Sequence, residues 1–190
     1  MPRKPRIYGE SGYMHIISRG VAKQIIFEDE QDHKVFISLM QMYSIETGVT
    51  VIAYCLMDNH YHMLIQTKGD SVSKFIHHLG TKYSIYYNAK YDRTGHLFQD
   101  RFKSENVEDE SYFMTVFRYI IRNPETAGIC KTEEYKWHSL YHPESINKFV
   151  DLRVPIGIAG GVNKLRKFVL TDNNDECMDC EPPITKVTGF

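Results

Sequence analysis

Two closely spaced histidines are the side chains in this sequence best suited to chemistry. His60 and His62 flank one residue within the apolar run from Met57 to Ile65. Side chains at i and i+2 of a β-strand project from the same face, so both imidazoles would point together. Such a pair can ligate a divalent metal and leave coordination positions for a substrate. Because the chain has nine histidines, the pair indicates a metal site only when other features support it.

A second candidate pair lies further along the chain. Tyr119 and Asn123 are four residues apart in a segment with apolar residues at helical spacing, so they share one helical face. The phenol could serve as a nucleophile and the amide oxygen as a metal ligand. Alternatively, Tyr119 is a partly buried aromatic residue and Asn123 a helix C-cap. Pro124 should end the helix at Asn123, because proline disfavours helix in the residue before it.

The elements that must position these residues follow a regular order. Asp58 and Asn59 are turn residues that should join two of the strands as a hairpin. The order βαββαβ predicts an α+β, ferredoxin-like sandwich with helices on one face of an antiparallel sheet, plus an extra C-terminal helix that carries Tyr119. Hydrophobic patterning predicts strands over 13–18, 49–56, 60–66 and 96–107, and helices over 29–46 and 71–91, with a third helix that follows Ser111 and ends at Asn123.

Length and composition indicate a globular protein. We expect one domain over 1–142 and a C-terminal extension over 143–190, made of short helices and a loosely ordered acidic tail. No run approaches the roughly 20 apolar residues of a membrane span, and no apolar segment of a signal peptide follows the basic N-terminus. We therefore expect a cytoplasmic protein. Cys177 and Cys180 have the spacing of half a zinc site, but no second pair follows them.

Basic residues are concentrated locally although the net charge is only −1. Residues 74–103 are rich in lysine and arginine, so they form either a phosphate-binding face or a solvated helix face. Arg101 and Lys103 alternate with Phe102, which would turn both charges outward. The candidates for contacts with DNA phosphates are Lys82, Arg93, Arg101, Lys103, and the two arginines near Tyr119, Arg118 and Arg122.

Several motifs in order resemble the single-tyrosine HUH transposases (the IS200-like family), and most of all the REP-associated tyrosine transposases of bacteria. The resemblance covers residues 8–142, with further support from Tyr13-Met14-His15, Arg19-Gly20 and Tyr135-Lys136-Trp137-His138-Ser139. Its main motifs are His60-Tyr61-His62, Gly95-His96-Leu97-Phe98-Gln99-Asp100-Arg101-Phe102-Lys103-Ser104 and Arg118-Tyr119-Ile120-Ile121-Arg122-Asn123-Pro124.

The resemblance implies an enzyme that cuts and rejoins single-stranded DNA at REP-like hairpins. His60, His62 and Asn123 would hold one Mg²⁺ or Mn²⁺, which polarises the scissile phosphate. Tyr119 would attack that phosphate and form a 5′-phosphotyrosine intermediate. Asn123 is a weaker ligand than a carboxylate and shorter than glutamine, so the metal should bind weakly and depend on DNA. Members of the family occur as monomers and dimers, so a homodimer is one expectation, and the protein would be associated with the nucleoid.

Other interpretations stay open at this point. Tyr83, Tyr86, Tyr87 and Tyr91 could compete as nucleophiles, although only Tyr119 precedes a polar residue at i+4 and a proline. His15 could approach the metal or fill the core. The protein could instead be a catalytically silent nucleic-acid-binding regulator with the same fold. It could also be a metal phosphohydrolase without a covalent step, which would stay active after Tyr119→Phe.

Overall fold

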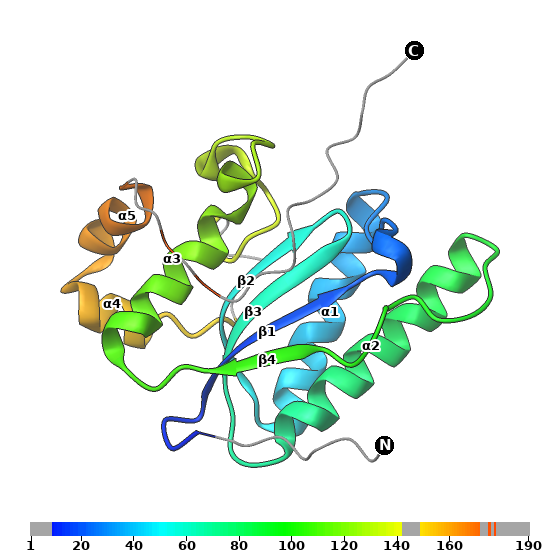
Figure 1. Cartoon of the computed structure of the whole chain (residues 1–190), viewed down its shortest axis with the longest axis horizontal. Coiled ribbons are helices and arrows are strands. Elements are labelled where there is room, and N and C mark those ends of the chain that lie inside the picture. Colours follow the sequence, from blue (N-terminus) through cyan, green and yellow to red (C-terminus); the bar gives the residue numbers. More distant parts are fainter. Residues whose placement is uncertain (1–8, 142–148, 172–174, 176, 178–190) are drawn as a thin grey trace.

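The computed structural model describes residues 9–141 and 149–171, together with Asp175 and Cys177. The basic N-terminal segment, Cys180 and most of the acidic tail lie outside the described residues. In chain order the elements are β1 (Tyr13–Arg19), a 3₁₀ turn (Val21–Lys23), α1 (Glu30–Thr47), β2 (Thr50–Met57), β3 (His60–Gln66), α2 (Ser71–Lys90), β4 (Lys103–Asn106), α3 (Glu110–Thr126), a second 3₁₀ turn (Thr132–Glu134), α4 (Arg153–Ala159) and α5 (Val162–Leu170) (Figure 1).

The four strands form one antiparallel sheet in the order β2-β3-β1-β4. Helices α1 and α2 cover one face of this sheet, and α3 covers the other (Figure 1). This arrangement confirms the predicted ferredoxin-like sandwich with an extra helix that carries Tyr119. None of the described helices is both long and apolar enough to span a membrane.

The sheet separates two apolar cores because strand side chains alternate between its faces. The first core packs α1 and α2 against residues such as Met14, Ile16 and Met63. The second packs α3 against the opposite face, where Leu64 and Cys55 lie. His60 and His62 have the same parity as Leu64, so they belong to the face under α3.

The structure corrects two predicted boundaries. The fourth strand begins at Lys103 rather than at residue 96; the preceding loop has only one isolated bridge, between Phe98 and Gly20. Helix α3 continues through Pro124 to Thr126. Proline lacks the N–H that a helix interior needs. Pro124 is nevertheless buried, and its carbonyl accepts a hydrogen bond from the Ile129 amide. Packing and this backbone hydrogen bond stabilise the last turn of the helix.

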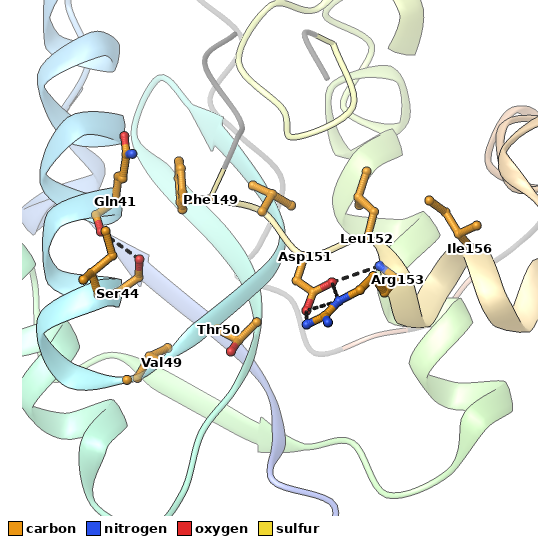
Figure 2. A pocket seen from close by; sticks show the side chains of 12 residues that line it. Gln41, Ser44, Val49, Thr50, Phe149, Asp151, Leu152, Arg153 and Ile156 are labelled. Atoms are coloured by element: carbon orange, nitrogen blue, oxygen red, sulfur yellow. Dashed lines mark hydrogen bonds and ion pairs between the residues drawn. The ribbon is translucent and has the colours of Figure 1, made fainter. Parts of the chain in front are cut away.

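Segments from the C-terminal part of the chain cover the outer edge of β2. The Trp137 carbonyl accepts from the Leu56 amide, and the Asp151 amide donates to the Val51 carbonyl. A groove of about 700 Å³ lies beside this edge, between the end of α1 and the start of α4, where Asp151 and Arg153 form an ion pair (Figure 2). Helices α4 and α5 lie in the predicted extension; the domain boundary itself stays a prediction.

Candidate active site under helix α3

His60 and His62 lie side by side on β3, as the i, i+2 spacing predicts. Their ring centroids are 5.0 Å apart, and both side chains are buried. The strand begins at His60 directly after the Asp58–Asn59 turn, so the pair stands at the end of the sheet where β2 returns as β3. A regular strand therefore fixes the direction of both imidazoles.

Helix α3 brings Tyr119 to these histidines. The Tyr119 ring lies 5.6 Å from the ring of His62, centroid to centroid, in an edge-to-face arrangement. The helix starts at an N-cap in which the Asp109 side chain accepts from the Tyr112 amide. Its apolar stripe, which includes Phe117, is buried against the sheet and holds Tyr119 in place. Tyr119 is only 7% exposed.

Asn123 stands one turn after Tyr119 on α3 and is buried as well. It is not the C-cap of the helix, because that position is occupied by Ala127. The described residues contain no cluster of three or more His, Cys, Asp or Glu side chains that could hold a metal ion. Two histidines alone leave a ligand set incomplete, so further ligands would have to be an amide oxygen, water or the substrate.

His15 joins the site, which sequence reasoning left undecided. Its Nε2 lies 3.1 Å from His62 Nδ1, and its ring centroid lies 6.1 Å from that of Tyr119. Strands β1 and β3 pair so that His15 is opposite Leu64, which places it on the α3 face. The side chains of His15, His62 and Tyr119 thus form one buried cluster.

Burial keeps these imidazoles neutral. It lowers the pKa of His15 and of His60 to about 3 and lowers that of His62 well below its usual value. Arg19, which lies opposite His60 in the β1–β3 register, lowers the pKa of His60 further through its positive charge. Only neutral imidazoles have a lone pair for a metal, so the donor set of His60, His62 and the Asn123 amide fits a divalent cation.

The candidate phosphate-binding residues fall into two groups. Lys103 is exposed on β4. Ile17 of β1 is paired with Lys103 on one side and with His62 on the other, so Lys103 and His62 lie in one row across the sheet, on the face under α3. Lys82 is exposed on α2, and Arg101 lines a separate groove beside that helix. These three lysine and arginine side chains are accessible to DNA, and only Lys103 lies on the face that carries the histidines.

The other three arginines are engaged within the protein. Arg118 is buried, and its guanidinium forms two 2.6 Å bonds with Asp175. Arg122 donates to the carbonyl of Thr171, and Arg93 donates to the side chain of Gln24. A guanidinium has five N–H donors, so a phosphate contact by these arginines would either use the remaining donors or displace an existing bond.

The tyrosines of α2, together with its C-cap Tyr91, lie on the opposite face of the sheet and have structural bonds there. The hydroxyls of Tyr83 and Tyr87 donate to backbone carbonyls, and those of Tyr86 and Tyr91 donate to Asp32. None of these four lies in the cluster with His62, whereas Tyr119 does.

Taken together, the fold and the cluster define a ferredoxin-like protein with a tyrosine helix over a histidine pair. A sequence model of the family described as "Transposase IS200 like" matches residues 10–123. The chain therefore belongs to the IS200-like transposase family, which confirms the resemblance inferred from its motifs.

A solved structure with a similar fold supports this architecture. The structure of a REP-associated tyrosine transposase bound to a REP hairpin is similar with a TM-score of 0.64 and 11% identity, over 99% of this chain and 100% of that one. A putative transposase from Deinococcus radiodurans R1 has a TM-score of 0.42 and 16% identity, over 63% and 95% respectively. No curated protein matches the chain.

Proposed function

We propose that this transposase-family protein is a metal-dependent endonuclease and strand transferase for single-stranded DNA with hairpins. One observation carries the proposal: Tyr119 lies beside His62, with 5.6 Å between ring centroids, on the sheet face that also holds His60. The family supports a transposase, and the similar fold of a protein solved with a REP hairpin supports a hairpin-containing DNA. Such a protein would act in the cytoplasm, on the DNA of the nucleoid.

In this reaction the Tyr119 oxygen attacks a backbone phosphorus and loses its proton. The bond from phosphorus to the DNA 3′-oxygen breaks, the 3′-oxygen takes up a proton, and the 5′ side stays on the tyrosine as a phosphodiester. Reversal by a free 3′-hydroxyl rejoins a strand without ATP. His60, His62 and Asn123 would hold Mg²⁺ or Mn²⁺, which when bound supplies Lewis-acid polarisation of the phosphate.

Side chains around the cluster support binding of the DNA backbone and the use of one chain per site. Lys103, in one row with His62, is suited to a phosphate beside the reacting one. Helix α3 packs on its own sheet, so Tyr119 and His62 of a single chain can form the site. We therefore propose an active site in cis, and a homodimer would not be needed to complete it.

The test is incubation with single-stranded hairpin oligonucleotides from the host genome and Mn²⁺, followed by a denaturing protein gel. Wild type should give a DNA-linked band, whereas Tyr119→Phe and His62→Ala should give none. Tyr112→Phe is the matched control, because Tyr112 is on the same helix but donates its hydroxyl to Glu105. It should keep the band.

Two results would replace this proposal with another function. Cleavage that survives Tyr119→Phe would indicate a phosphohydrolase without a covalent step. Tight hairpin binding without cleavage under either metal would indicate a DNA-binding regulator.

A further inference from the structure

Asn59 contacts His60 directly at the start of β3. It occupies the turn between β2 and β3, its side chain is buried, and its Oδ1 lies 2.7 Å from Nδ1 of His60. The contact is a hydrogen bond. Whether His60 carries its proton on Nδ1 or on Nε2 determines which of the two ring nitrogens has a lone pair for another group. The orientation of the Asn59 amide therefore bears on the chemistry of His60.

A second hydrogen bond sets that orientation. The Asn59 Nδ2 donates to the carbonyl of Lys23 over 3.2 Å. A carbonyl oxygen only accepts, so the nitrogen side of the amide must face Lys23 and the oxygen side must face His60. A flipped amide would place its oxygen against the carbonyl oxygen of Lys23 and its NH₂ against the imidazole. Since the amide oxygen can only accept, Nδ1 of His60 must carry the proton.

A neutral imidazole carries one N–H, so protonated Nδ1 leaves a lone pair on Nε2. We infer that Asn59 is a positioning residue that holds His60 in the Nδ1–H tautomer and so presents its Nε2 to a divalent cation. This inference rests on the proposed function, which supplies the metal.

The turn from Gly20 to Lys23 fixes the position of Asn59 through two hydrogen bonds. Ala22 and Lys23 have φ of 51° and 62°, a left-handed conformation that residues other than glycine seldom adopt. The amide of Gly20 donates to the Asn59 carbonyl, and a Cβ on Gly20 would lie 2.4 Å from the carbonyl oxygen of Gln24. Side-chain and main-chain bonds of Asn59 thus both end on this one turn, which fixes the amide against His60.

The first test needs no metal. Nitrogen-15 NMR of the wild-type imidazoles, with the His60 signals assigned by their loss in His60→Gln, should show a protonated Nδ1 and a bare Nε2. In Asn59→Ala the population should move toward Nε2–H, which free imidazole side chains prefer in water. A wild-type His60 that carries its proton on Nε2 would overturn the inference, whatever the variants do.

The second test measures binding of Mn²⁺ by electron paramagnetic resonance, first to the protein alone and then with a single-stranded hairpin oligonucleotide present. Loss of a partner that orients a ligand should weaken Mn²⁺ binding by roughly 10- to 100-fold in Asn59→Ala. Asn59→Asp keeps an oxygen for the Nδ1–H and should restore most of the affinity, although it cannot donate to Lys23. Asn88→Ala is the matched control. Asn88 lies on α2, and its side-chain amide also donates to a backbone carbonyl, that of Gly95.

Unchanged Mn²⁺ affinity in a folded Asn59→Ala would overturn the inference. Wild-type protein that binds no Mn²⁺ and forms no DNA adduct would overturn the proposed function instead. The tautomer of metal-free His60 separates these two failures, because it depends on the hydrogen bond and not on the metal.

Discussion

His15 and His62 share one hydrogen bond across the paired strands β1 and β3, with 3.1 Å between Nε2 and Nδ1. Both rings are buried and neutral, so one proton lies between these two nitrogens. If His62 is to bind a metal through Nε2, its Nδ1 must carry that proton and donate it to His15. His15 would then support His62 as Asn59 supports His60, from a different strand.

We therefore predict that His15→Leu impairs the proposed reaction without removing any ligand. It removes the acceptor that His15 offers to the Nδ1–H of His62, so metal affinity and DNA cleavage should fall by roughly 10- to 100-fold. His15→Gln offers an amide oxygen near the same place and should retain more activity than His15→Leu. Cleavage rates at several Mn²⁺ concentrations would check this, and equal rates in all three proteins would contradict it.

The sequence predicted the main elements of the fold, including those that carry this site, because each has a strong local pattern. The predicted strand over 60–66 coincides with β3, and the helix predicted over 71–91 ends within one residue of α2. The stripe that begins at Phe113 also identified α3 and placed Tyr119 and Asn123 on it. Their roles in catalysis and metal binding stay predictions.

Long-range pairings could not be predicted in the same way. The contact between His15 and His62 depends on the register of β1 against β3, which no local pattern specifies. The pairing of Arg118 with Asp175 likewise depends on where the chain returns after α5. The helix boundary at Asn123 was wrong because the local preference before Pro124 was outweighed by packing of the last turn.

Away from the site, Asp32 connects the start of α1 to the end of α2, and its loss should destabilise the fold. Its buried carboxylate accepts from Lys90 and from the hydroxyls of Tyr86 and Tyr91. The backbone amides of Glu28 and Asp29 donate to it as well. Asp32→Ala would remove this acceptor from five donors and should lower the free energy of unfolding by about 3 kcal/mol, since Lys90 stays partly exposed. Urea denaturation measures this change.

The control for Asp32 is Glu30→Ala on the same helix. Glu30 pairs with Lys34 and Lys136, but all three side chains are more than half exposed to solvent. Surface ion pairs contribute little to stability, so the urea midpoint should stay near that of wild type. An Asp32→Ala protein as stable as the Glu30→Ala protein would show that the buried carboxylate does not hold the helices together.

His138 should make the fold sensitive to mild acid. Its Nε2–H donates to the Thr132 carbonyl and its Nδ1 accepts from the Leu140 amide, so a second proton has no place in the folded protein. Burial lowers its pKa from 6.5 to about 4. Between these two pH values the unfolded chain binds a proton that the folded chain does not, so stability must fall as the pH falls.

The loss of stability depends on how far the pH falls between 6.5 and about 4, the pKa values of His138 in the unfolded and the folded chain. From pH 6.5 down to pH 5, His138 alone should cost about 2 kcal/mol of unfolding free energy. His15, His60 and His62 have lowered pKa values too, and they steepen the decline in the same direction. The contribution of His138 is therefore read as a difference between two proteins. His138→Gln should lose about 2 kcal/mol less than wild type between pH 7 and pH 5 in urea denaturation, and parallel losses in both proteins would mean that His138 takes up its proton in the folded state.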